Sequence, residues 1–208
     1  MTQITGNAII VRTLFNNRYT VQYYQREYNW ERKQIEELME DLTSEFLEFY
    51  QQGDTQRDVM RYGNYFLGPI ILTNDNAIID GQQRLTTIML LLRAFYSRFE
   101  KMKDVQSQKL REMIGKCLWM TDEFEQPDFS QLKIDSEVAS DNDKEEFLYI
   151  LKEGTTTEKM KSRYAINFRF FQKMIDTFIT EYPAYFPYLP SRILNNCFLL
   201  PIEADQQD

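Results

Sequence analysis

One stretch near the middle of the chain constrains the fold most, because it changes from a strand pattern to a helix pattern within a few residues. The apolar run Tyr65–Leu72 predicts a buried strand, Asn74–Asn76 a tight turn, and Ala77–Ile79 the returning strand of a hairpin. Apolar residues at helical spacing then predict a long helix over residues 84–103: Leu85, Ile88, Met89, Leu92, Phe95, Tyr96 and Phe99. The polar residues Asp80–Arg84 therefore lie between a strand and a helix N-terminus.

This strand-to-helix junction has the chemistry of an anion site. Backbone N–H groups in the first turn of a helix lack partners within the helix, and the helix dipole favours a negative charge there. Gly81 lets a ligand approach the backbone, and Arg84 offers a planar fork for phosphate oxygens. Asp80 is a candidate general base or Mg²⁺ ligand, and Gln82 and Gln83 can donate or accept hydrogen bonds. The alternative is an ordinary turn with helix-capping residues, since such junctions need not bind a ligand.

Two motifs carry a resemblance to a known family. The loop Asp-Gly-Gln-Gln-Arg-Leu-Thr-Thr at residues 80–87 resembles the signature of the GmrSD-type restriction endonuclease N-terminal family. Upstream, Tyr24-Gln25-Arg26-Glu27-Tyr28-Asn29-Trp30 is similar to that family's Tyr-Gln-Arg-x-Tyr-x-Trp box. The resemblance is strong over residues 8–100 and loose beyond them. In this chain Val21-Gln22 stands where the family often has Ile-Pro.

The resemblance implies a nucleotide site. The family is similar to the ParB/sulfiredoxin superfamily, in which a loop of this type holds a nucleoside triphosphate at a helix N-terminus. The implied cofactors are an NTP (GTP or ATP) and Mg²⁺. The implied nucleotide-binding residues are Gln25, Arg26, Gly81, Gln82, Gln83, Arg84, Thr86 and Thr87. The implied catalytic residues are Asp80, Gln82, Gln83, Arg84 and Arg26, with Asp80 also the candidate Mg²⁺ ligand.

Further expectations concern the surroundings of this site. Gln25-Arg26 and Asp80–Arg84 should converge on one pocket, because both motifs end extended segments. Three aromatic residues of the box, Tyr24, Tyr28 and Trp30, could stack on a base or could equally be core residues. Sulfiredoxin chemistry is not expected, because it needs a cysteine where this loop has glutamines.

Two functions compete at this stage. The first is an NTP-binding and NTP-hydrolysing N-terminal domain of a DNA restriction or phage-defence endonuclease that acts on foreign or modified DNA. The second is a non-hydrolysing ParB-like DNA-binding or regulatory module. Asp80 and the two glutamines favour the first, since plain phosphate binding does not need a carboxylate near anions. Nuclease activity is not expected in this segment. We expect DNA to be bound through the full-length protein, which would continue into a C-terminal nuclease domain or act with a nuclease subunit.

Composition narrows the chemistry further. The chain has 208 residues and no histidine, which excludes Ser-His-Asp and Cys-His triads within it. Its net charge of −8 argues against a broadly basic nucleic-acid surface, although residues 80–120 carry eight basic and four acidic side chains. Cys117 and Cys197 form no Cys-x-x-Cys pair, so we expect two buried thiols in a cytoplasmic protein. No apolar run approaches the roughly 20 residues of a membrane span, so no membrane partner is expected.

The expected fold class is α+β. We expect a small mixed sheet of ParB/sulfiredoxin-like type from residues 8–83, packed by helices over 31–51 and 84–103. This part, residues 1–103, would be the NTP-binding domain, and residues 104–208 a mainly α-helical region. Other expected elements are a strand through Ile9–Phe15, a helix capped by Asn29, helices over 105–120 and 155–182, a helix that ends at Gly154, and a buried strand over 197–202.

Overall fold

The computed structural model describes residues 7–22, 27–136 and 141–204. In chain order the elements are β1 (Ile9–Ile10), α1 (Val11–Leu14), β2 (Tyr19–Val21), α2 (Arg32–Phe49), α3 (Gln56–Val59), β3 (Tyr65–Leu72), β4 (Ala77–Asp80), α4 (Gln82–Phe99), α5 (Val105–Leu118), β5 (Trp119–Thr121), β6 (Pro127–Leu132), β7 (Ile134–Ser136), α6 (Asp141–Glu153), α7 (Arg163–Glu181), α8 (Tyr188–Asn196) and β8 (Cys197–Glu203). The α+β class is confirmed. The finer expectation of a ParB/sulfiredoxin-like sheet stays a prediction.

The main sheet has six strands in the order β1-β8-β3-β4-β2-β7. The β1/β8 and β3/β4 pairs are antiparallel, whereas β8/β3, β4/β2 and β2/β7 are parallel, so the sheet is mixed as expected. Its expected confinement to residues 8–83 is wrong, because β7 and β8 join it. The strand over 197–202 was expected, but its place beside β3 was not, since strand partners far apart in the chain are chosen by tertiary packing.

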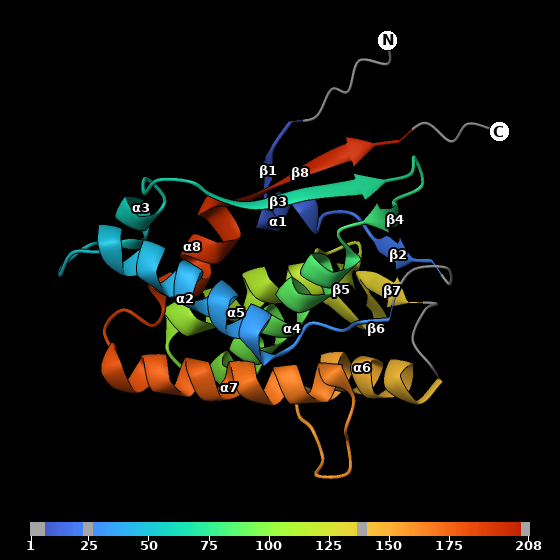
Figure 1. Cartoon of the computed structure of the whole chain (residues 1–208). Helices are drawn as coiled ribbons and strands as arrows, with labels where there is room; N and C mark the ends of the chain where they lie inside the picture. Colours follow the sequence, from blue (N-terminus) through green and yellow to red (C-terminus); the bar gives the residue numbers. More distant parts are fainter. Residues whose placement is uncertain (1–6, 23–26, 137–140, 205–208) are drawn as a thin grey trace.

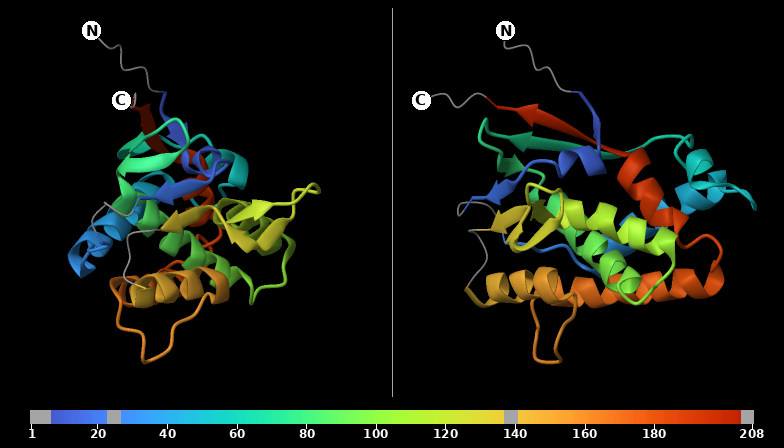
Figure 2. Two further views of the ribbon diagram at one scale, coloured as in Figure 1. Left: turned by 90° about the vertical axis from the view of Figure 1, so that its right-hand side faces the viewer. Right: turned by 180° about the vertical axis from the view of Figure 1, so that it is seen from behind.

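Helix α4 lies in the middle of the molecule. Figures 1 and 2 show the sheet on one side, α2, α4 and α5 in a middle layer, and α7 with α6 on the other side. Most of α4 is buried, including the run Ile88–Leu92, which is apolar on every face of the helix. A helix that is apolar all round is stable only where other elements surround it. The long apolar segment after the signature loop therefore became the central core helix.

Several expected boundaries need correction. Ile9–Phe15 is a two-residue strand followed by the short helix α1, because Val11, Leu14 and Phe15 are all buried at helical spacing. Helix α2 is capped by Glu31 and not by Asn29, since Glu31 and Gln34 form a capping box. Helix α7 begins at Arg163, not residue 155, because Ser162 caps it through a hydrogen bond from the Ala165 N–H.

Other expectations are confirmed. The β3–β4 hairpin forms as predicted, with its turn held in part by Asn76 at a φ of 62°. Gly154 follows α6 with a φ of 66°, as a residue just past a helix C-terminus should. Both cysteines are free and buried, and β8 covers the predicted C-terminal strand. None of the helices within residues 7–22, 27–136 and 141–204 combines the length and hydrophobicity that a membrane span requires.

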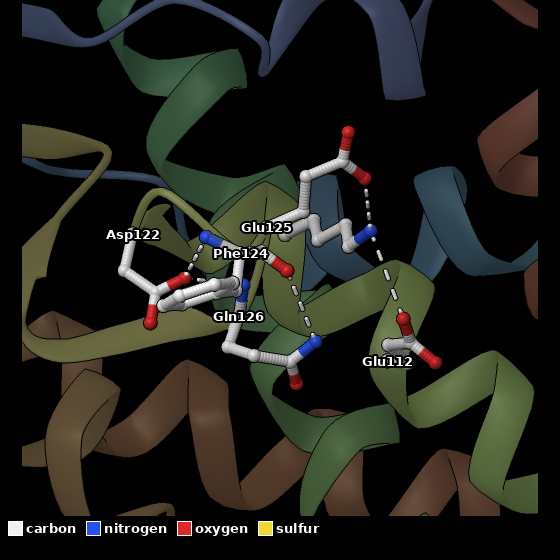
Figure 3. Close-up of polar contacts among 6 residues, drawn as sticks. Glu112, Asp122, Phe124, Glu125 and Gln126 are labelled. Atoms are coloured by element: carbon white, nitrogen blue, oxygen red, sulfur yellow. Dashed lines mark hydrogen bonds and ion pairs between the residues drawn. The ribbon is translucent and has the colours of Figure 1, made fainter.

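A second, two-stranded sheet follows α5. The helix expected over 105–120 ends at Leu118, and the chain continues directly into the β5–β6 hairpin, which lies at the side of the molecule in the left view of Figure 2. Figure 3 shows how its turn is held: Asp122 Oδ1 accepts hydrogen bonds from the N–H groups of Phe124 and Gln126. Lys116 Nζ on α5 lies 3.1 Å from Glu125 Oε2, so the turn is tied to the helix behind it.

The strand order predicts that the first 103 residues depend on the rest of the chain. A 1–103 fragment would lack β8, the parallel neighbour of β3, and would also lack α5 and α7, which pack on α4. We expect no cooperative thermal transition for this fragment by circular dichroism, whereas the 208-residue chain should unfold cooperatively. The division into domains at residue 103 stays a prediction, and a cooperative transition in the fragment would support it.

Candidate functional site

A pocket of about 540 Å³ lies at the N-terminus of α4. Residues from three parts of the chain line it: Asn29, Trp30, Pro69, Asp80, Gly81, Gln82, Gln83 and Arg84. The first two belong to the aromatic box before α2, Pro69 belongs to β3, and the other five form the signature loop and the first turn of α4. The structure therefore brings part of each sequence motif to one pocket. Helix α4 begins at Gln82, two residues earlier than expected, so Gln82–Arg84 are helical.

Two glycines allow the backbone to approach closely at this pocket. Gly81, the N-cap of α4, has a φ of 92°, and a Cβ there would lie 2.7 Å from Ile70 Cγ2 on β3. Gly68 on β3 has a φ of 120°, and a Cβ there would lie 2.8 Å from the guanidinium carbon of Arg84. Glycine is favoured at both positions for two reasons: the backbone is left-handed, and a side chain would not fit. Gly81 also brings no side chain that could cap the first N–H groups of α4.

The guanidinium of Arg84 packs against β3. Its Nη1 donates a hydrogen bond of 2.9 Å to the Pro69 carbonyl, and the absent side chain of Gly68 makes room for the guanidinium. Among residues 7–22, 27–136 and 141–204, Arg84 forms no ion pair. A guanidinium has five N–H donors, so this hydrogen bond fixes its position and leaves donor capacity for an anion.

Asp80 is the single carboxylate that lines the pocket among the described residues. It is the last residue of β4 and is exposed. It makes no ion pair with Arg84, although both belong to the same loop and both line the pocket. Both charged residues line the pocket without neutralising each other in an ion pair.

Gln83 attaches the aromatic box to α4. Its side-chain amide accepts a hydrogen bond from the Asn29 N–H and donates one to the Glu27 carbonyl, both at 2.9 Å. The two ends of one amide thus bind two backbone groups of the segment that precedes α2. This contact gives Gln83 a positioning role at the edge of the pocket.

A buried hydrogen-bond cluster supports the same segment from behind. The Tyr28 hydroxyl lies 2.9 Å from Thr87 Oγ1 on α4 and 3.0 Å from Asn167 Nδ2 on α7. Asn167 Nδ2 also donates to the Trp30 carbonyl at 2.8 Å. Burial raises the pKa of Tyr28 to about 12, so its hydroxyl stays neutral and keeps its proton for hydrogen bonding at physiological pH.

The predicted site residues divide into three groups. Asp80, Gly81, Gln82, Gln83 and Arg84 line the pocket. Thr86 and Thr87 are buried in α4 and do not line it, and the Thr87 hydroxyl donates to the Gln83 carbonyl. Gln25 and Arg26, with Tyr24, lie outside the described residues. Of the other box aromatics, Tyr28 is a core residue stacked on Tyr164 at 4.7 Å between ring centroids, whereas Trp30 lines the pocket.

Sequence reasoning missed two residues that shape this site. Gly68 interrupts an otherwise apolar strand run, and an isolated glycine in a strand signals a bulge or a close backbone approach. The β3/β8 register indeed shifts between Phe66 and Gly68. Asn167 stands beside Phe168 in the buried stripe of α7, and a polar residue on an apolar helix face signals a buried hydrogen bond.

Comparison with known families decides the membership of the chain. The family described as "GmrSD restriction endonuclease, N-terminal domain" matches residues 11–208. The chain belongs to this family. The suspected resemblance is thereby confirmed, and the match extends beyond residues 8–100 to the helices and strands that complete the sheet. Membership in a restriction endonuclease family supports a role in phage defence. A search of curated proteins found no match.

The described part of this GmrSD-family chain offers little for a metal ion on its own. Within it, no three or more Asp, Glu or Cys side chains are grouped closely enough to hold one. Asp80 is the pocket's single described carboxylate. This donor set fits Mg²⁺, which commonly uses one or two carboxylates together with waters and substrate phosphates. It does not fit a metal held by protein ligands alone.

The cluster around Asn167 predicts a stability effect. Asn167→Leu removes the donor to both the Tyr28 hydroxyl and the Trp30 carbonyl. We expect a loss of about 2–3 kcal/mol in the free energy of unfolding, which corresponds to a melting temperature lower by roughly 4–12 °C. Lys173→Ala, at an exposed position of the same helix, is the matched control and should change little. Equal melting temperatures for the two variants would contradict the role given to Asn167.

Proposed function

We propose that the pocket binds a nucleoside triphosphate, GTP or ATP, with Mg²⁺ and hydrolyses it, as the N-terminal part of a restriction endonuclease that acts on foreign or modified DNA. The observation that carries this proposal is Arg84, which has no ion-pair partner among the residues that the structure describes and lies in the first turn of a helix that begins at a left-handed glycine. These are the features of a phosphate site: a fixed cation, backbone N–H groups and the positive end of a helix dipole.

The phosphate-binding part would consist of Gly81 and the first turn of α4. The N–H groups of Gln82, Gln83 and Arg84 belong to that turn, where the N-cap glycine supplies no capping side chain. Arg84 would add charge-assisted hydrogen bonds to phosphate oxygens, the strongest class available to a neutral-pH anion site. The carbonyl of Pro69 holds Arg84 in place before any ligand arrives. Preorganisation of this kind lowers the entropy lost on binding.

Asp80 distinguishes a hydrolase from a plain phosphate site. A carboxylate beside a bound triphosphate would weaken binding by repulsion unless it served a metal ion or a water molecule. At the exposed end of β4, Asp80 can hold Mg²⁺ together with phosphate oxygens, or orient the attacking water. This favours the hydrolytic function over a non-hydrolysing ParB-like regulatory module. Arg26 and Gln25, which the resemblance places near the phosphates, remain part of the proposal.

The NTP site would gate DNA cleavage that takes place elsewhere. The chain has no histidine, which excludes a histidine-based nuclease centre within it, and its net charge of −8 argues against a broadly basic DNA-binding face. We therefore propose that DNA is bound and cut through the full-length protein, by a C-terminal nuclease domain or subunit. In this arrangement the pocket reports nucleotide state and the nuclease performs the cleavage.

Two substitutions in the loop should have opposite effects on binding and turnover. Arg84→Ala removes a charge-assisted contact, so NTP affinity should fall about 10- to 150-fold, or roughly 1.5–3 kcal/mol. Asp80→Ala removes a negative charge from an anion site, so binding should survive or tighten while turnover falls by about 100-fold or more. Calorimetric titration with NTP and Mg²⁺, together with a phosphate-release assay, measures both quantities.

The controls separate this pattern from a loss of stability. Arg57→Ala removes an exposed arginine that does not line the pocket, so it should change neither affinity nor turnover. If Asp80 were only a turn residue, its replacement would lower the stability by about 1 kcal/mol and leave binding and turnover intact. Unchanged NTP affinity in a folded Arg84→Ala protein would end the phosphate-site proposal.

The charge distribution predicts how strongly this segment alone binds DNA. Its net charge of −8 opposes a polyanion, whereas the excess of basic residues over 80–120 provides a local attraction. We expect weak binding to duplex DNA that falls steeply with added salt, because such binding depends on counterion release. A gel-shift series over salt concentration measures this. Tight binding that is insensitive to salt would be incompatible with it.

A further inference from the structure

We propose that Trp30 is the stacking platform for the base of the nucleotide. This inference rests on the proposed function, because it concerns the part of the same pocket that the phosphates would not fill. Among the eight described residues that line the pocket, Trp30 is the single aromatic one. Indole is a large π-surface, and stacking on such a surface is the commonest way for proteins to hold an unpaired base.

Exposure distinguishes Trp30 from the other aromatic residues nearby. Trp30 is half-buried: it packs against the hydrophobic core and also lines the pocket. Tyr28, two residues earlier, is buried and stacked on Tyr164, with an interplanar angle of 10°. The second tryptophan of the chain, Trp119, is only 1% exposed. Tyr28 and Trp119 are therefore buried in the core, whereas Trp30 is accessible from the pocket.

The backbone at Trp30 is fixed from both directions along the chain. Asn167 Nδ2 on α7 donates to the Trp30 carbonyl at 2.8 Å, and Gln83 holds Asn29, the preceding residue, through its N–H at 2.9 Å. The following residue, Glu31, is the N-cap of α2 and pairs with Arg163 at 3.1 Å. Three successive residues are therefore held by α4, α7 and the start of α2. Because this backbone is already held, a base that stacks on the indole would not have to order the segment that carries it.

The contacts also relate the platform to the phosphate site. Gln83 lies in the first turn of α4 between Gln82 and Arg84, and the same residue holds the segment that carries Trp30. A single side chain thus sets the spacing between the proposed phosphate-binding turn and the indole. The pocket volume of about 540 Å³ is within the range of small-molecule sites, which is typically about 300–1,000 Å³. The chemistry predicted for the ligand is a triphosphate with an attached aromatic base.

The test compares a nucleotide with a ligand that has the phosphates but no base. Calorimetric titrations with Mg²⁺ would measure the affinities for GTP, ATP and inorganic tripolyphosphate in the wild-type chain and in Trp30→Ala, Trp30→Phe and Arg84→Ala variants. We expect Trp30→Ala to lower the affinity for the nucleotides on the order of 10- to 100-fold and to leave tripolyphosphate binding within about twofold. Trp30→Phe should restore most of the lost affinity, because a smaller aromatic ring still stacks.

The other outcomes separate this inference from the phosphate site. Arg84→Ala should weaken all three ligands together. If Trp30→Ala left nucleotide affinity unchanged, or weakened tripolyphosphate equally, the stacking role would be overturned while the phosphate site stood. If the wild-type chain bound none of the three ligands, both proposals would fail. Retained tripolyphosphate binding also shows that the Trp30→Ala protein is folded at the site.

Fluorescence supplies an independent readout. The chain has two tryptophans, so Trp119→Phe leaves Trp30 as the sole indole. In that background, nucleotide should change the emission of Trp30 and tripolyphosphate should change it far less, since only a base contacts the ring. Equal responses to the two ligands would contradict stacking. Titration of the Trp30→Ala protein, in which the buried Trp119 remains, should show no nucleotide-dependent change.

Discussion

The joint between β4 and α4 determines both the core and the pocket. Gly81 turns the chain in the left-handed region directly beside Ile70 on β3, where no Cβ would fit. This turn directs α4 beneath the sheet, where its apolar faces become buried between the sheet and α7 (Figure 1). The same turn places the N-terminus of α4 at the pocket, where the N-cap residue Gly81 supplies no capping side chain. One backbone conformation therefore buries the body of the helix and exposes its positive end.

Around this joint, side-chain hydrogen bonds connect parts of the chain that are far apart in sequence. Gln83 holds the segment before α2, and Asn167 on α7 holds Tyr28 and Trp30. A buried polar group that loses its partner destabilises the fold more than a paired one stabilises it. The buried hydrogen bonds of Asn167 therefore favour one arrangement of the pocket wall. They also make a local site depend on α7, which lies on the opposite side of α4 from the sheet.

The chain is acidic as a whole, yet its pocket contains the positively charged Arg84. The protein carries a net charge of −8, yet the carboxylate nearest Arg84 in sequence, Asp80, forms no ion pair with it. Exposed charges farther apart than about 8–10 Å are largely screened at physiological salt. At the pocket itself, the guanidinium of Arg84 and the helix dipole act at short range, and Asp80 is the single carboxylate among the described lining residues. The net charge of this GmrSD-family domain is therefore compatible with the proposed anion site.

The sequence alone determined the elements around the site and its chemistry, because these depend on neighbouring residues. Hydrophobic spacing gave the β3–β4 hairpin and α4, the Asp-Gly pair gave the break between them, and Arg84 gave the cation. Only the tertiary structure decided which strands complete the sheet, with β8 placed between β1 and β3. It also decided that Gly68 makes room for Arg84, that Thr87 faces the core, and that Asn167 supports Trp30. These outcomes depend on contacts between residues far apart in the chain, and local patterns carry no information about which distant surfaces meet.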